Sequence, residues 1–112
     1  MAGAFLTPPK ARYWVVESQG TLVGSCSIVT EWSNFRGGDY WWIQSLYIAP
    51  AHRGTGLVDT MLQHLVTEAQ GAGAIDLRLY GFNTNARALR AYQRFGFSEA
   101  PYLILTKSLI GE

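Results

Sequence analysis

The chain has 112 residues, of which 48% are hydrophobic, 13% aromatic and 15% charged. A chain of this length forms one core, so we expect a single domain over residues 1–112. Disordered chains have the opposite balance of apolar and charged residues, which excludes that class. The formal net charge of +1 is too small for the basic surface of a nucleic-acid-binding protein, so we expect no nucleic-acid partner.

The single cysteine and the N-terminal residues bear on compartment and metal binding. Cys26 is the only cysteine, which excludes an internal disulfide and a cysteine cluster for zinc. It lies in an apolar stretch, and we expect it to be a small core residue. No basic segment precedes the apolar residues 4–6, unlike in a signal peptide, and no apolar run is long enough to cross a bilayer. These features predict a cytoplasmic protein with no membrane partner and no metal.

The first half of the chain predicts an antiparallel meander of three strands. An extended lead-in over residues 1–11 precedes a stretch of β-forming residues at 13–18. Two longer stretches of the same kind cover residues 21–32 and 40–48. Glycine-containing turns separate the three stretches.

The periodicity of apolar residues changes after Pro50. A one-and-four spacing predicts a helix that begins at Leu57 and ends at Gly71. Residues 75–80 predict a short strand. A strand, a helix and a strand joined by short turns form a right-handed parallel crossover.

A second helix and two closing strands are expected in the last third of the chain. The helix begins after Asn85 and ends at Gly96, and the strands are expected from Phe97 onward and over residues 103–109. The whole pattern predicts an α/β fold. Its sheet is mixed and mostly antiparallel, with one parallel strand–helix–strand step and two main helices.

A turn with two glycines, Gly54 and Gly56, lies between the third strand and the first helix. The start of a helix leaves unpaired N–H groups, and glycine lets the backbone approach a bound phosphate closely. The turn predicts a phosphate site, or a strand-to-helix turn whose own geometry needs glycine. No Lys-Ser or Lys-Thr follows the glycines, and Asp59 stands where a dinucleotide site has its third glycine, which excludes both of those nucleotide sites.

This turn resembles the GNAT N-acetyltransferase superfamily. Members carry a strand with an aliphatic end, a proline, and then arginine-glycine-any-glycine at a helix start, as residues 46–50 and 53–57 do here. The resemblance implies acetyl-CoA as co-substrate and no metal. It implies that the strand backbone at Leu46 and Ile48 pairs with the pantetheine arm of CoA. It also implies that the CoA pyrophosphate is bound by the amides of Arg53, Gly54, Thr55, Gly56, Leu57 and Val58.

A second motif in residues 85–97 resembles the same superfamily and is more specific. Members of the family share an asparagine, an alanine three residues later, a tyrosine seven residues later, and a glycine-phenylalanine pair after the helix. All five stand here at that spacing, as Asn85, Ala88, Tyr92, Gly96 and Phe97. Asn85 is expected to cap the helix, and the resemblance implies that it also contacts the pantetheine arm.

Tyr92 is the candidate catalytic acid. Acyl transfer from a thioester expels a thiolate, and a phenol of pKa about 10 is protonated at neutral pH and can donate its proton to it. Spacing alone favours a core aromatic on an amphipathic helix, and the resemblance favours the acid.

The general base is not assigned by the sequence. Many members of the superfamily have a glutamate on the strand before the glycine turn, where this chain has Gln44. Glutamine does not accept a proton at neutral pH. A water bound by Gln44 and backbone groups is one alternative, and Asp39, Glu31 or Tyr47 is the other.

The resemblance implies an N-acetyltransferase that transfers the acetyl group by direct attack in a ternary complex. The acceptor is a small-molecule or peptide amine. A non-catalytic CoA-binding module with a regulatory or structural role is the alternative, and an α/β interaction domain that binds no CoA is a third interpretation.

Family members begin with a strand and two helices, for which the residues before Tyr13 leave no room. Their absence is expected to expose a sheet edge and apolar residues at 13–16 and at Trp41 and Trp42, which predicts a homodimer. Five aromatic residues of the second hairpin are expected to serve as acceptor site, core or subunit interface: Trp32, Phe35, Tyr40, Trp41 and Trp42.

Overall fold

The computed structural model describes residues 11–81 and 85–110, and the chain divides into two units, Met1–Tyr80 and Gly81–Glu112. Apart from Ala11, which is outside any strand, the expected extended lead-in lies outside the described residues.

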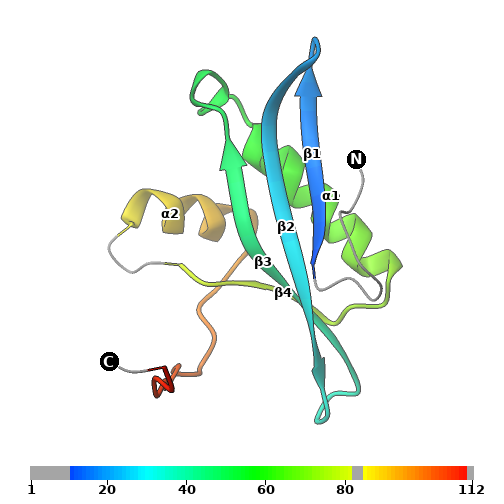
Figure 1. Ribbon diagram of the computed structural model, residues 1–112, viewed down its shortest axis with the longest axis vertical. Coiled ribbons are helices and arrows are strands. Elements are labelled where there is room, and N and C mark those ends of the chain that lie inside the picture. Colours follow the sequence, from blue (N-terminus) through cyan, green and yellow to red (C-terminus); the bar gives the residue numbers. More distant parts are fainter. Residues whose placement is uncertain (1–10, 82–84, 111–112) are drawn as a thin grey trace. The chain divides into compact units, whose positions relative to one another are not determined.

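The first unit contains a four-stranded sheet in the order β1-β2-β3-β4 (Figure 1). The strands are β1 (Arg12–Ser18), β2 (Thr21–Ser33), β3 (Gly38–Ile48) and β4 (Asp76–Leu79). The first three strands are antiparallel neighbours, and β4 pairs with β3 in the parallel sense. The predicted meander and the predicted parallel step are both confirmed.

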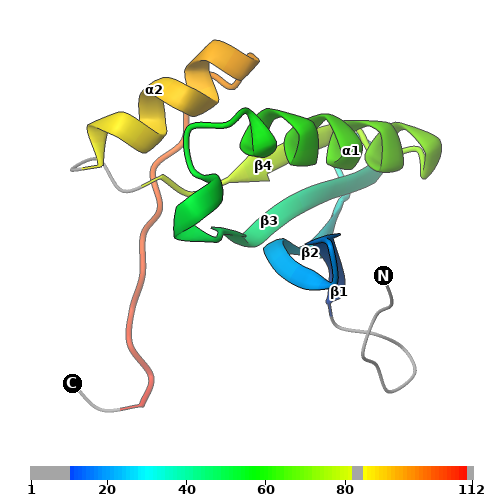
Figure 2. The same cartoon turned by 90° about the horizontal axis from the view of Figure 1, so that it is seen from above.

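Helix α1 (Leu57–Gly71) connects β3 to β4 and covers one face of this sheet (Figure 2). A short 3₁₀ turn, η1 (Pro50–His52), precedes it. The predicted apolar stripe forms the helix side of the core, with Leu65 fully buried. The buried apolar residues of the unit are Val23, Cys26, Ile28, Trp41, Ile43, Met61, Leu62, Leu65 and Ala69.

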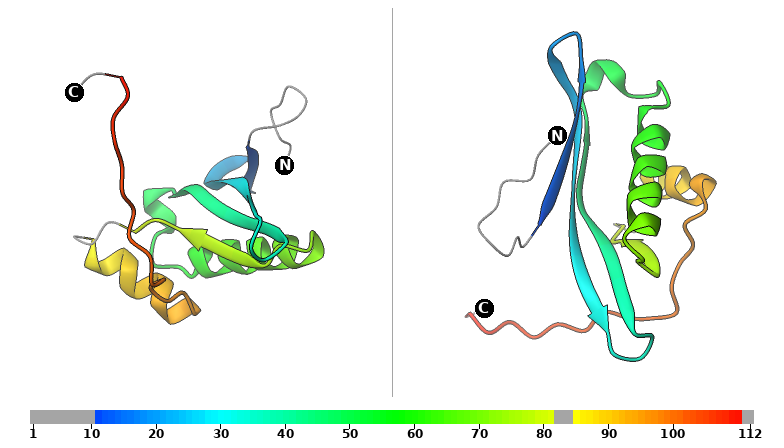
Figure 3. Two further views of the ribbon diagram at one scale, coloured as in Figure 1. Left: turned by 90° about the horizontal axis from the view of Figure 1, so that it is seen from below. Right: turned by 90° about the vertical axis from the view of Figure 1, so that its right-hand side faces the viewer.

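A glycine on β2 sets how closely α1 approaches the sheet, along which it runs (Figure 3). A Cβ atom at Gly24 would lie 2.9 Å from Met61 Sδ and 3.2 Å from the carbonyl oxygen of Tyr47. The Met61 side chain is flexible and could move away from an added Cβ atom, whereas the Tyr47 carbonyl would have to shift by a few tenths of an ångström. Gly24 therefore allows α1 and β3 to lie close to β2 at this point.

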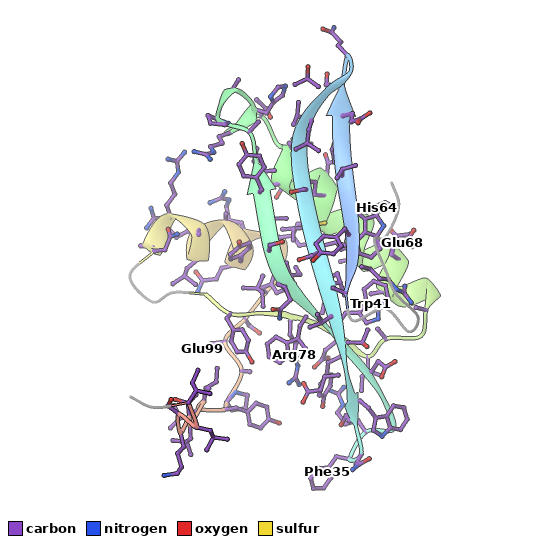
Figure 4. The ribbon with its side chains drawn as sticks, in the orientation of Figure 1. Phe35, Trp41, His64, Glu68, Arg78 and Glu99 are labelled. Atoms are coloured by element: carbon purple, nitrogen blue, oxygen red, sulfur yellow. The ribbon has the colours of Figure 1, made fainter. Side chains whose placement is uncertain are left out.

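Trp41 lies in the core, so the expectation that it is exposed to water is wrong. Its side chain is 2% exposed. Trp14 packs beside it at 6.1 Å between ring centroids, and the Arg12 guanidinium lies 5.3 Å from its ring. Figure 4 shows His64 beside Glu68 on α1, and the His64 ring meets Trp14 edge-on with 6.3 Å between ring centroids. Because side chains alternate between the faces of a strand, Trp42 points to the opposite face.

The second unit contains helix α2 (Ala86–Phe95) with the predicted limits. The Asn85 side chain accepts a hydrogen bond from the Ala88 amide at 3.2 Å, the N-cap expected for this residue. Gly96 ends the helix with a φ of 114°, a left-handed conformation that glycine adopts readily. The residues predicted to face inward are all half-buried: Ala88, Leu89, Tyr92 and Phe95.

The two closing strands are absent, and this prediction is wrong. The described residues from Phe97 to Ile110 form neither strand nor α-helix. A strand needs a neighbour for its backbone N–H and C=O groups. The described part of the second unit contains one helix and no strand, so this segment has no strand to pair with inside its unit.

Among the described residues, no helix is long and apolar enough to cross a bilayer.

Burial makes Cys26 an unreactive thiol. Desolvation raises its pKa to about 11, so the reactive thiolate is scarce at pH 8.5. We expect iodoacetamide to alkylate native Cys26 on the order of a hundredfold more slowly than the same thiol in urea, followed by mass spectrometry. Equal rates in the native and unfolded chains would show that Cys26 is not a core residue.

Candidate functional site

The edge of β3 is unpaired over its last residues. The parallel ladder between β3 and β4 runs from Tyr40 to Ile43 on β3 and ends at Leu79 on β4. Strand β3 continues to Ile48 with β2 as its one described neighbour. The backbone of residues 44–48 therefore presents a free edge at which an extended molecule can add as a further strand.

The antiparallel register shows which backbone groups face this free edge. The Ala49 amide donates to the Val23 carbonyl at 2.8 Å, so residues 23 and 49 form a hydrogen-bonded pair. Such pairs alternate with non-hydrogen-bonded ones, which places Leu46 and Ile48 in non-hydrogen-bonded pairs with β2. Their N–H and C=O groups point away from β2. Leu46 and Ile48 are the two residues that the sequence predicts for pairing with pantetheine.

A β-bulge marks the point where β3 leaves β4. Ser27 pairs with Ser45 and Ile28 pairs with Ile43, so Gln44 is the extra residue on β3. The hydroxyls of Ser27 and Ser45 are hydrogen-bonded at 2.7 Å on one side of the bulge. Gln44 itself is exposed.

The glycine turn has the conformation and the open space that a phosphate site needs. Gly54 and Gly56 have φ values of 78° and 86°, where other residues are strained. A Cβ atom at either position would meet nothing within 4 Å. No side chain caps helix α1, so the first amides of the helix, from Leu57 onward, have no acceptor within the helix. Uncapped amides facing open space suit an anion.

The side chains around the turn tie it to the end of β3. Arg53 Nε donates to the Ile48 carbonyl at 3.0 Å, and the Thr55 hydroxyl donates to the His52 carbonyl. Among the described residues, His52 Nδ1 is the buried side-chain polar atom without a hydrogen-bond partner. Asp59 lies in the first turn of α1, where a carboxylate interacts favourably with the helix dipole but repels a phosphate. Arg53 places a positive charge on the same turn.

The first unit thus brings together all the predicted CoA-binding residues except Asn85. The end of β3, with Leu46 and Ile48, lies beside the turn that carries residues 53–58, as the bond from Arg53 to Ile48 shows. Asn85 and Tyr92 belong to the second unit.

Tyr92 is half-buried on α2 and packs edge-on against Phe97, with 6.0 Å between ring centroids. Burial raises the pKa of the Tyr92 phenol. The phenol is therefore protonated at neutral pH, as a proton donor must be.

An aromatic stack that sequence reasoning missed lies beside the bulge. Trp42 stacks on Tyr80 with 4.5 Å between ring centroids, and its Nε1 donates to Glu31 at 2.7 Å. Arg78 lies over the neighbouring Tyr40 ring at 3.6 Å and is paired with Asp76 at 2.9 Å. The parallel register pairs Trp42 with Arg78. Tyr80 follows Arg78 by two residues and therefore lies diagonally across from Trp42. Period-2 alternation in both strands, read with that register, would have found the stack.

The proposed bases have different surroundings. Glu31, Asp39 and Tyr47 are all exposed, and Glu31 in addition accepts a hydrogen bond from Trp42 Nε1. No three histidine, cysteine, aspartate or glutamate side chains gather to bind a metal within residues 11–81 and 85–110.

A model of the acetyltransferase (GNAT) family matches residues 2–97. This match covers most of the chain. The chain belongs to the GNAT acetyltransferase family. The glycine turn, the free β3 edge and the Asn85–Phe97 motif all lie within the matched residues.

Two acetyltransferases are similar to this chain over part of their length. Streptothricin acetyltransferase of Streptomyces lavendulae is 39% identical over 56 residues, which are 50% of this chain and 30% of that protein. L-methionine sulfoximine/L-methionine sulfone acetyltransferase of Salmonella typhimurium is 32% identical over 84 residues, or 75% and 48% of the two chains. The chain therefore spans less than half the length of either relative.

Solved structures share the fold. A possible acetyltransferase from Clostridium difficile 630 superposes with a TM-score of 0.83 at 24% identity, covering 91% of this chain and 68% of that one. The structure of AAC(6')-Iy with the bisubstrate analogue CoA-S-monomethyl-acetylneamine has a TM-score of 0.76 at 13% identity, over 88% and 69% of the two chains.

The glycine turn can be tested with a matched pair of variants. Gly56→Val places a side chain where the backbone would approach a phosphate, and we expect calorimetry to show at least a tenfold loss of acetyl-CoA affinity. Gly73 has a similar φ of 80° and equally open surroundings at the far end of α1. Gly73→Val therefore introduces comparable strain, about 1–2 kcal/mol, with no expected change in affinity. Equal affinities for both variants would show that the turn does not bind the pyrophosphate.

Proposed function

We propose that this chain transfers the acetyl group of acetyl-CoA to an amine by direct attack in a ternary complex. One observation carries the proposal: the uncapped glycine turn lies beside an unpaired strand edge in a chain of the GNAT family. A phosphate-binding helix start and an edge for an extended amide chain are the two features that CoA requires.

The arrangement of the first unit supports the following binding roles. The amides of residues 53–58 hold the pyrophosphate, and Arg53 adds a positive charge beside it. The backbone groups of Leu46 and Ile48 hydrogen-bond the pantetheine amides as a neighbouring strand would. Arg53 already occupies one lone pair of the Ile48 carbonyl, and the second lone pair remains for the ligand. The family resemblance of the Asn85–Phe97 motif supports a further contact of Asn85 with the pantetheine arm.

Acetyl-CoA supplies a thioester that an amine can attack directly. The amine nitrogen bonds to the acetyl carbon, and the carbon–sulfur bond breaks. Tyr92 gives its phenolic proton to the departing sulfur. The amine loses its proton to a water at the bulge, where Gln44 orients the water without accepting the proton. A water in turn returns a proton to Tyr92.

The acceptor is a small amine. The two relatives of known activity are named for streptothricin and for methionine sulfoximine and sulfone, which supports a small-molecule amine rather than a protein. The open face of the sheet beside the bulge offers the exposed Tyr80 ring, backed by Trp42, as an apolar surface for the body of the acceptor.

A non-catalytic CoA-binding module is the second candidate. The chain spans 30% and 48% of its relatives' lengths, so parts of those enzymes have no counterpart in the aligned residues. Thiol release with a panel of small amines separates the candidates: a module binds acetyl-CoA and releases no CoA beyond background hydrolysis.

We further propose a cytoplasmic homodimer. The free thiol of Cys26 suits a reducing compartment. Tyr13, Val15 and Tyr47 are exposed on the sheet face opposite α1, and a second copy would cover such apolar surface.

Removing the phenolic hydroxyl tests the acid. We expect Tyr92→Phe to lower turnover by roughly a hundredfold with little change in acetyl-CoA affinity. Tyr13→Phe removes an exposed hydroxyl on β1 and serves as the control, with unchanged turnover. A Tyr92→Phe enzyme as fast as the control would make Tyr92 a packing residue.

The pH profile gives an independent test of the same residue. The acid works in its protonated form, and burial raises the pKa of Tyr92, so its contribution persists at neutral pH and is lost as pH rises through that raised value. We therefore expect kcat to show no loss attributable to this phenol below a pH of about 10. A loss between pH 7 and 9 that Tyr92→Phe abolishes would show that Tyr92 titrates there and would contradict the raised pKa.

A further inference from the structure

A pair of serine hydroxyls lies at the bulge of β3, beside the residues proposed to bind CoA. Ser27 Oγ on β2 and Ser45 Oγ on β3 are 2.7 Å apart. Ser27 is 4% exposed, whereas Ser45 is exposed. Both serines and the bulge residue Gln44 belong to the first unit, so the geometry of the three is defined within that unit.

The bulge turns Gln44 and Ser45 to the same face of the sheet. Ile43 is buried in the core, and Leu46 pairs with Cys26, which lies in the same core. Cross-strand partners share a face, so Ile43 and Leu46 both point to the side that α1 covers. The two residues between them therefore both point to the opposite face, which a regular strand would not allow.

Burial fixes the direction of the hydrogen bond between the two serines. Among the described residues, Ser45 is the one hydrogen-bond partner of the Ser27 hydroxyl. A buried hydroxyl that donates to nothing is costly, so Ser27 donates and Ser45 accepts. The Ser45 hydroxyl then keeps its own hydrogen and a second lone pair, and both are available to water on that face.

The proposed course of the pantetheine arm brings the thioester to this point. The pyrophosphate is assigned to residues 53–58 and the arm to Ile48 and Leu46, so the arm runs back along β3 toward the bulge. Its reacting end lies next to Ser45 and Gln44, at the edge where β3 has parted from β4. The attacking amine must lose a proton there, and the Gln44 amide does not accept one.

We infer that Ser45 relays the proton of the attacking amine to bulk water. The inference rests on the proposed acetyl transfer and supplies its proton route. As the carbon–nitrogen bond forms, the amine gives a proton to a water held by Gln44 and Ser45. That water passes one of its own protons to the second lone pair of Ser45, which releases its hydroxyl proton to bulk water. Ser45 and the bound water end with the protons they started with, and Ser27 is a positioning residue that holds the Ser45 oxygen.

Alanine and threonine variants test whether the Ser45 hydroxyl carries the proton. Ser45→Ala is expected to lower the single-turnover rate of acetyl transfer about tenfold or more, with the acetyl-CoA affinity from calorimetry unchanged. Ser45→Thr keeps a hydroxyl and is expected to stay within about threefold of wild type. The acceptor is the small amine that gives the fastest CoA release in the panel, and transfer is followed by the acetylated product.

Two controls separate the relay from a packing role. Ser45→Ala leaves the buried Ser27 hydroxyl without a partner and is expected to lower the melting temperature. Replacing both serines with alanine removes that unpaired group, so the double variant is expected to melt closer to wild type and still transfer as slowly as Ser45→Ala. Ser25→Ala removes a hydroxyl from the same face of β2, two residues from Ser27 and opposite Tyr47, and is expected to leave the rate unchanged.

Rescue by a small base gives a readout that a packing role would not move. Imidazole titrates near neutral pH and can take the amine proton in place of the relay. Added imidazole is expected to raise the transfer rate of Ser45→Ala several-fold and to leave the rates of wild type and Ser25→Ala unchanged.

The possible results separate the relay from the proposed function. A wild-type chain that transfers acetyl to no amine of the panel would overturn both. Transfer by Ser45→Ala as fast as by Ser25→Ala would leave the proposed function standing and overturn the relay. A slow Ser45→Ala that imidazole does not accelerate, or a Ser45→Thr that is equally slow, would overturn it as well.

Discussion

The early end of one strand ladder is the constraint on which the rest of the structure depends. Strand β4 stops at Leu79, opposite Ile43, while β3 continues to Ile48. The bulge at Gln44 lies where the two strands part, and the alternation of antiparallel pairs turns the polar groups of Leu46 and Ile48 toward the gap. Unpaired backbone groups in a sheet attract an extended partner, and in this family the partner is proposed to be part of CoA.

The anion site depends on the same strand. Helix α1 follows β3 after the short η1 turn and the glycine turn, and Gly24 allows Met61 of α1 to pack closely against β2. Arg53 ties the turn to the last carbonyl of β3 at 3.0 Å. The position of the free amides at the start of α1 is therefore set by core packing, so changes in the core beneath α1 are expected to affect the phosphate site as well as stability.

Local patterns predicted the elements whose stabilising contacts are close in sequence. The one-and-four stripe identified α1, Asn85 and Gly96 marked the ends of α2, and the glycine turn was found from Gly54 and Gly56. Contacts between distant residues were harder to predict. The closing strands failed because strand composition does not supply a neighbour, and Trp41 was misplaced because the face it occupies depends on the register of β3. The stack of Trp42 on Tyr80 needed the parallel register, which no local pattern contains.

The most direct test of the CoA site is an acetyl-CoA titration of the ¹⁵N-labelled chain, followed by amide NMR spectra. At 12.4 kDa the chain, or its dimer, is small enough for residue-level assignment. The largest shifts are expected on the amides of residues 53–58, with a second group at Leu46 and Ile48. Pantetheine, which carries no phosphate, is expected to shift only the second group. Shifts that spare both groups, or no saturable shift at millimolar acetyl-CoA, would contradict this assignment.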